Sequence, residues 1–199
     1  MDVYRVYLDI ETYSPKGEPD FHSDKVIAIG FKSLTDADVT VFKEWEDGER
    51  VILEKFLGYI EGLKDRGLLE LVGFNILRFD IPFIISRAYR HGLGGLEDLY
   101  YTLLRDIFAI DLLQCLLPYN NFRYAGLSAL NIALRLSMPF SEYRSEEIAE
   151  FYDNKEYDKI VSHVKSDVLF TEHLDRALRL KMFFEGMISF ESRKPQERL

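Results

Sequence analysis

The alternation of apolar and polar residues along the chain predicts an α/β fold. Runs rich in β-branched and aromatic residues predict strands at 3–10, 25–32, 38–43 and 68–74. Apolar residues at helical spacing predict helices at 49–66, 80–91, 127–136, 145–152 and 158–184. Residues 106–113 should begin as a fifth strand and turn into a short helix. This order favours a mixed five-stranded sheet with helices on both faces.

Turn-forming residues mark several of the boundaries. The short segment 33–37 predicts a hairpin, so the strands on either side of it should be antiparallel. Residues 12–24 contain two prolines and a glycine and should form a loop, whereas Pro82 suits the first turn of a helix that Gly92 closes. With no repeat or linker, we expect one domain over residues 1–190 and a polar tail over 191–199.

Composition and charge narrow the class of protein. Apolar residues make up 47% and charged residues 30%, which is the balance of an ordinary globular protein. The single cysteine, Cys115, excludes a disulfide framework and argues against a thiolate zinc site. The absence of a long apolar run predicts a soluble, intracellular (cytoplasmic) protein without a membrane partner. A net charge of −9 argues against a protein that coats nucleic acid with a broad basic face.

Acidic residues in three separate segments are the candidate chemistry. Asp9 and Glu11 point to the same side of the first strand, because side chains two positions apart share a face. Asp80 stands at the start of a predicted helix, and Asp167 follows His163 by one helical turn on another. Carboxylates gathered in one place repel one another unless a cation lies between them, and such oxygen ligands suit Mg²⁺ or Mn²⁺.

Each acidic residue also has a simpler interpretation. Asp9 and Glu11 suit a solvated strand end, Asp80 suits a helix cap, and Asp167 suits the edge of an apolar helical stripe formed by Ile160, Val164, Val168 and Leu174. A two-ion site for phosphodiester chemistry therefore requires that the segments meet in space.

The segments resemble the three motifs of the DEDD (DnaQ-like) 3′–5′ exonucleases, which have a ribonuclease-H-like fold. The version they are most similar to is the proofreading domain of family B DNA polymerases, here as a stand-alone domain. The resemblance spans about residues 3–180 and is carried by Leu8-Asp9-Ile10-Glu11-Thr12, by Phe74-Asn75-x-x-x-Phe79-Asp80-x-Pro82-Phe83, and by His163-x-x-x-Asp167-Val168.

The resemblance implies an enzyme and a set of roles. It implies hydrolysis of single-stranded nucleic-acid 3′ ends, with DNA favoured over RNA, to nucleoside 5′-monophosphates. The implied ligands of two divalent ions, Mg²⁺ or Mn²⁺, are Asp9, Glu11, Asp80 and Asp167. A replication or repair protein is a possible partner.

His163 departs from the family pattern. The tyrosine branch of the family has its tyrosine four residues before the last aspartate, and the histidine branch has its histidine five residues before it. Here a histidine stands in the tyrosine register, on the same helix face as Asp167. An imidazole can take a proton from water at neutral pH, so we expect a catalytic role for His163, the alternative being a partly exposed helix histidine.

Substrate contacts are expected from four residues. Thr12 and Asn75 follow from their motif positions, Phe79 is either a stacking or a core residue, and Tyr124 lies in the aromatic and arginine-containing segment 119–124, which suits single-strand stacking or a packed surface loop. Two rival functions remain at this stage. One is a nucleic-acid-binding module with poor turnover, and the other is a structural subunit with a vestigial acidic pocket.

Overall fold

A five-stranded mixed sheet forms the centre of the molecule. The computed structural model describes residues 2–17, 19–116, 132–133, 136–138 and 140–191, with side chains up to residue 180. The strands follow the order β3-β2-β1-β4-β5 across the sheet, with β1 antiparallel to β2, β2 antiparallel to β3, and β1, β4 and β5 parallel. Their bounds are Asp2–Tyr13, Lys25–Ser33, Thr40–Lys43, Gly67–Gly73 and Phe108–Asp111 for β1 to β5. The predicted α/β class and the hairpin are confirmed.

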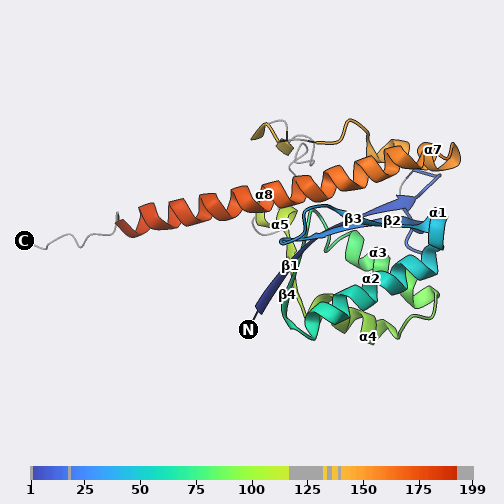
Figure 1. Cartoon of the computed structure of the whole chain (residues 1–199), viewed down its shortest axis with the longest axis horizontal. Helices are drawn as coiled ribbons and strands as arrows, with labels where there is room; N and C mark the ends of the chain where they lie inside the picture. Colours follow the sequence, from blue (N-terminus) through green and yellow to red (C-terminus); the bar gives the residue numbers. More distant parts are fainter. Residues whose placement is uncertain (1, 18, 117–131, 134–135, 139, 192–199) are drawn as a thin grey trace, which may run out of the picture.

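Helices cover both faces of this sheet (Figure 1). On one side lie α2 (Glu49–Lys64), α3 (Asp80–Arg90) and α4 (Leu96–Tyr100), and on the other lie α7 (Ile148–Asp153) and α8 (Tyr157–Glu191). The remaining described elements are short: α1 (Glu44–Asp47), a π-helical turn (Tyr101–Arg105), α5 (Leu112–Leu116) and a 3-10 turn (Ser145–Glu147). Most of the predicted helix at 127–136 lies outside the described residues.

The two faces of β1 have different partners. Val6, Leu8 and Ile10 belong to a core cluster with residues of α2 and α3. Tyr7 belongs to a second cluster with Val168 and other residues of α8. Since side chains alternate along a strand, the odd-numbered residues of β1, Asp9 and Glu11 among them, face α8.

The sequence predicts that the first strand ends at residue 10. In the structure, β1 continues through Asp9 and Glu11 to Tyr13. It remains paired with β2 as far as Tyr13, with an irregularity between Glu11 and Thr12. Its parallel pairing with β4, however, stops at Tyr7 and Val72. The β4-facing edge of β1 beyond Tyr7 is therefore free of the sheet ladder and open to the segment that follows β4.

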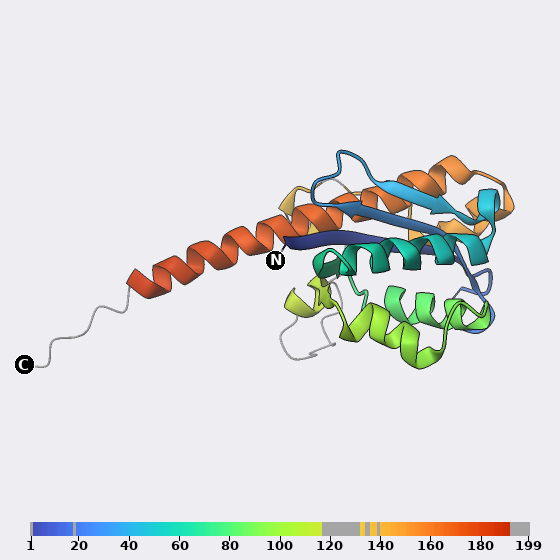
Figure 2. The same ribbon diagram turned by 60° about the horizontal axis from the view of Figure 1, so that its bottom comes forward.

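Helix α8 is longer than predicted. Its 35 residues give it a length of about 52 Å, and it runs past the predicted end at Phe184 to Glu191. Its first half packs on the sheet through the predicted stripe of Ile160, Val164, Val168 and Leu174, whereas its C-terminal half projects beyond the strands (Figure 2). Among the helices of the described part of the chain, none is long and apolar enough to cross a membrane.

Candidate metal centre

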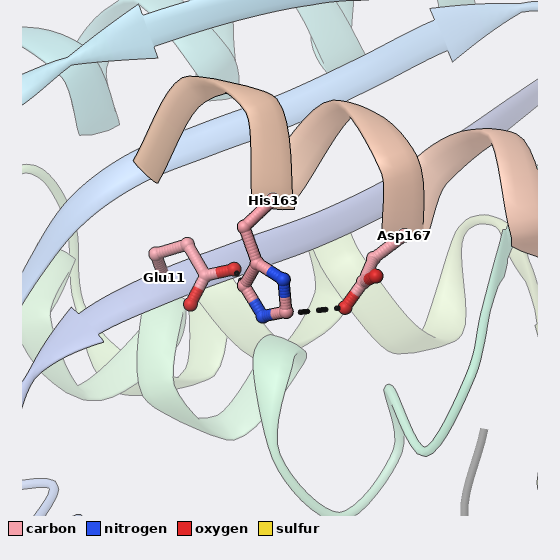
Figure 3. Close-up of side chains that lie close together, drawn as sticks. All are labelled: Glu11, His163 and Asp167. Atoms are coloured by element: carbon pink, nitrogen blue, oxygen red, sulfur yellow. Dashed lines mark ion pairs between the residues drawn. The ribbon is translucent and has the colours of Figure 1, made fainter. Parts of the chain in front are cut away.

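The contact between β1 and α8 brings the first and third acidic segments together. Glu11 is 6% exposed, and the ring of His163 lies between it and Asp167 (Figure 3). His163 Nε2 is 3.5 Å from Glu11 Oε1 and 3.7 Å from Asp167 Oδ2. One ligand atom from each of the three residues lies within 4.8 Å of the others, which is the size of a site for one metal ion. The i, i+4 spacing on α8 supplies two of these side chains from one helix face.

Asp80 joins this group from the other layer of the fold. It is the first residue of α3, is 3% exposed, and its Oδ1 accepts a hydrogen bond of 3.0 Å from the backbone N–H of Ile10. That N–H is available because β4 no longer pairs with β1 at this point. The helix-cap alternative is not what the structure shows, because the N-cap of α3 is Phe79, without a side-chain cap hydrogen bond.

The pKa values of the four carboxyl groups are all raised above their usual range. Burial, followed by the charges of Asp167, Asp80 and Glu11, raises the pKa of Asp9 well above its usual range. Burial and then Asp167 and Asp80 do the same to the pKa of Glu11. Burial raises the pKa values of Asp80 and Asp167 to about 7 each. Four carboxyl groups that resist ionisation beside one another are a favourable set of ligands for a divalent cation.

His163 has no hydrogen-bond partner in this site. Its side chain is 2% exposed, and among the described residues the buried side-chain atoms without a partner are His163 Nδ1, His163 Nε2 and Asp167 Oδ1. Burial lowers the pKa of His163 to about 4, although the negative charge of Glu147 acts to raise it. The ring is therefore neutral at pH 7. Buried polar atoms without partners destabilise a fold, and a bound cation is the kind of group that would satisfy them. The residues present therefore fit a metal centre.

The four residues expected to contact the substrate differ in their positions relative to this site. Thr12 is 9% exposed and its hydroxyl lies 3.1 Å from that of Ser14, next to the site. Asn75 adopts a left-handed backbone conformation with φ 67° in the segment that leads to Asp80. The ring of Phe79 packs against Phe21 and Phe83, as a core residue does. Tyr124 lies outside the described residues.

Asp111 organises the approach to Asp80, which the sequence alone did not reveal. Its Oδ1 accepts hydrogen bonds from the backbone N–H groups of Leu113 and Gln114 at the start of α5, as a helix-capping residue does. The same carboxylate also accepts from the N–H groups of Asn75, at 2.9 Å, and Leu77, at 3.1 Å. Because β4 and β5 are parallel neighbours, their carboxyl ends meet, and an acidic residue at one end can hold the loop from the other.

Three arginines from the middle of the described chain, Arg87, Arg90 and Arg105, make contacts within the protein. Arg87 forms a bidentate pair with the carboxylate of Glu49 and also binds the carbonyl oxygen of His22, which Arg90 binds as well. Arg105 pairs with Asp106 and stacks on Tyr101. The contacts of Arg87 and Arg90 tie α3 to α2 and to the loop after β1, and so help to hold the helix that begins at Asp80.

The fold and this site define the class of polymerase-type exonuclease domains with a ribonuclease-H-like sheet. A family model described as "Predicted 3′–5′ exonuclease related to the exonuclease domain of PolB" matches residues 19–192. The chain belongs to this family. The match includes Asp80, His163 and Asp167, and it begins after Asp9 and Glu11.

Solved structures support the same fold, with 109 matching chains. One of them is the family B DNA polymerase from the hyperthermophilic archaeon Pyrobaculum calidifontis, which superposes with a TM-score of 0.69 at 18% sequence identity. The match covers 89% of this chain and 25% of the polymerase, so the present chain corresponds to about a quarter of that protein. A comparison with curated proteins found no significant match.

Proposed function

We propose that this domain is a two-metal-dependent 3′–5′ exonuclease that acts on single-stranded nucleic-acid ends, with DNA favoured over RNA, and releases nucleoside 5′-monophosphates. The observation that carries the proposal is the group that Glu11 and Asp167 form around His163, with unpartnered buried polar atoms in it and with Asp80 bonded to the backbone of β1 at the residue before Glu11. Family membership and the polymerase-like fold support the same reaction class. The unit that carries this activity is residues 1–190.

The ligands in this proposal are Asp9, Glu11, Asp80 and Asp167. Divalent ions bound there supply a polarised water and stabilise the charge that develops on the phosphate oxygens during an in-line displacement. The protein contributes a rigid arrangement: Asp80 is fixed to β1 through the N–H of Ile10, and Asp167 is fixed by the packing of α8 on the sheet. Substrate ends would be oriented by Thr12 and Asn75, which lie on the segments that carry Glu11 and Asp80.

The test is degradation of end-labelled single-stranded DNA and of RNA of the same sequence, in Mg²⁺, Mn²⁺ or EDTA. We expect stepwise shortening from the 3′ end in either metal and none in EDTA. Asp9→Asn should lower the rate at least about 100-fold, corresponding to about 2.7 kcal/mol of transition-state stabilisation. Asp38→Asn is the control, because Asp38 is an exposed aspartate outside the site.

Four other outcomes would reject the proposal. Hydrolysis that persists in EDTA, or that is unchanged in Asp9→Asn, would place the activity elsewhere. Tight binding of the DNA without products in Mg²⁺ and Mn²⁺ would identify a binding module. Neither binding nor hydrolysis by the folded protein would identify a structural domain with a vestigial pocket.

A further inference from the structure

We infer that His163 is itself a metal ligand and that, with Glu11 and Asp167, it forms a mixed nitrogen and oxygen site that prefers Mn²⁺ to Mg²⁺. This inference rests on the proposed function, since it concerns the same site, but it changes the task of the imidazole. The sequence suggested a histidine that takes a proton from water, whereas the geometry points to a histidine that binds the ion.

The distances around the ring are close to those between two atoms bound to the same ion. Two ligand atoms at about 2.1 Å from one ion lie about 3.0 Å apart at a right angle and about 3.4 Å apart at a tetrahedral angle. His163 Nε2 lies 3.5 Å from Glu11 Oε1 and 3.7 Å from Asp167 Oδ2, slightly wider than these values. Both distances exceed an ordinary hydrogen bond, so the ring is near both carboxylates without being bonded to either.

Burial explains why a ligand is needed. His163 is 1% exposed, and both of its ring nitrogens are buried without a hydrogen-bond partner, as is Oδ1 of Asp167. His163 Nε2 and Asp167 Oδ2, from neighbouring turns of one helix, lie 3.7 Å apart beside Glu11 (Figure 3). A single cation would satisfy a nitrogen and both carboxylates together, whereas a general base would need an open path from its ring to the attacking water.

The tyrosine register is what makes ligation possible. Residues four apart on a helix lie one above the other, and this is the spacing by which a helix presents two side chains to the same ion. Val164 and Val168, the next residues along the chain from each ligand, are 0% exposed in the sheet interface, so they fix the rotation of α8 that aims His163 and Asp167 at Glu11. A histidine in this position therefore adds a nitrogen atom to the carboxylate site.

A nitrogen ligand changes the choice of metal. Mg²⁺ prefers oxygen ligands and keeps several of its waters, whereas imidazole suits transition-metal ions. Mn²⁺ accepts both carboxylate oxygen and imidazole nitrogen. The site should consequently bind Mn²⁺ more tightly than Mg²⁺.

The experiment measures binding of Mn²⁺ to the full chain by titration calorimetry, together with pulsed electron paramagnetic resonance of the bound Mn²⁺. We expect a hyperfine coupling to nitrogen in the native protein that is lost in His163→Ala and in His163→Gln. Loss of this ligand should weaken Mn²⁺ binding at least about tenfold, because even residues that only support a ligand change metal affinity by about 10–100-fold. His163→Gln, which offers an amide oxygen, should lower the ratio of Mn²⁺ to Mg²⁺ affinity.

His173→Ala is the matched control, because His173 is an exposed histidine on the same helix. It should retain the nitrogen coupling and the Mn²⁺ affinity. Circular dichroism of the metal-free proteins establishes that each variant folds. A native protein that binds Mn²⁺ without nitrogen coupling, or that binds no Mn²⁺, would overturn the inference, as would unchanged affinity and coupling in a folded His163→Gln variant.

The two proposals fail in different ways. Nuclease activity without nitrogen coupling would leave the proposed function in place and remove His163 from the ligands. Nitrogen coupling without hydrolysis would support the ligand assignment and reject the exonuclease.

Discussion

A single buried carboxylate, that of Asp111, holds the loop that carries Asp80 into the site. Asp111 is 3% exposed and accepts from the N–H groups of Asn75, Leu77, Leu113 and Gln114. In Asp111→Asn, the amide keeps one acceptor oxygen and turns an NH₂ group toward at least one of these backbone N–H groups, so a partly buried donor loses its partner. We expect a loss of about 1–3 kcal/mol in the free energy of unfolding and a lower nuclease rate.

The measurement is urea denaturation of the variant beside Asp106→Asn. Asp106 is five residues earlier in the sequence, 36% exposed, and paired with Arg105 and Lys64 at the surface, where such pairs contribute about 0–1 kcal/mol. Equal stability of the two variants would show that Asp111 is an ordinary helix cap and that the loop is held by other contacts.

At the scale of elements, the approach of α8 to the sheet depends on Gly30. Gly30 lies on β2 opposite Asp9 in the β1–β2 register. A Cβ atom there would lie 2.7 Å from Cγ2 of Val164 and 3.3 Å from Cγ2 of Val168. These valines are the neighbours of His163 and Asp167 on α8, so the missing side chain allows the helix to bring both site residues within reach of Glu11.

Gly30→Ala should therefore lower stability by about 1–3 kcal/mol through overpacking and reduce Mn²⁺ affinity by displacing α8. Addition of Val164→Ala should restore part of the metal affinity, because it removes the clashing methyl groups. Gly62→Ala is the control: Gly62 is an exposed residue of α2 with open space at its Cβ position, where alanine should raise stability by about 0.5–1 kcal/mol. Thermal unfolding and Mn²⁺ titration measure both effects. Unchanged metal affinity in Gly30→Ala would separate the site from the helix spacing.

Sequence patterns predicted these elements better than the contacts between them. The stripe of α8, from Ile160 to Leu174, and the short apolar strand β4 follow directly from periodicity. The end of β1 was misplaced, because polar residues such as Glu11 and Thr12 remain in the ladder with β2. In α2, the apolar residues Val51 and Leu53 lie only two positions apart, but Val51 is 36% exposed and Leu53 is buried. The spacing of apolar residues predicts the buried face of a helix to within about one position. Packing against the neighbouring elements decides which residue is buried there.

The candidate site was predictable as a set of residues and not as a set of interactions. Asp9, Glu11, Asp80 and Asp167 stand in recognisable motifs. The structure places Glu11 and Asp167 on either side of His163 and bonds Asp80 to the backbone N–H of Ile10, the residue before Glu11. The hydrogen bond from the N–H of Ile10 to Asp80 depends on where the pairing between β1 and β4 stops. The hydrogen bonds that Asp111 accepts from Asn75 and Leu77 depend on the ends of β4 and β5 lying side by side. Both are long-range backbone contacts, which residue type and spacing do not encode.

At the scale of the whole molecule, the carboxyl groups of the site are among the 34 acidic residues that give the chain a formal net charge of −9. Its carboxyl groups have folded-state pKa values above their unfolded values, with Asp80 and Asp167 raised from 3.8 to about 7 by burial. Between these values the metal-free folded state binds more protons than the unfolded state, so these groups make stability fall as the pH rises from about 4 to about 7. His163, with its pKa lowered to about 4, acts in the opposite direction below its unfolded value of 6.5.

The contribution of one carboxylate can be isolated with Asp167→Asn, because Oδ1 of Asp167 has no hydrogen-bond partner to lose. At about pH 8 the metal-free variant should be more stable than the native protein by at least about 1 kcal/mol, since a tenfold change in an acid dissociation constant corresponds to about 1.4 kcal/mol. At a pH of about 4 the difference should vanish, because Asp167 is then protonated in the folded state. Added Mn²⁺ should reverse the order at pH 8 by stabilising only the protein that keeps the ligand. Thermal unfolding of the native protein and of Asp167→Asn, with EDTA or with Mn²⁺ at both pH values, measures these differences in stability. If the native protein is more stable than Asp167→Asn in EDTA at pH 8, then Asp167 stabilises the fold without a metal.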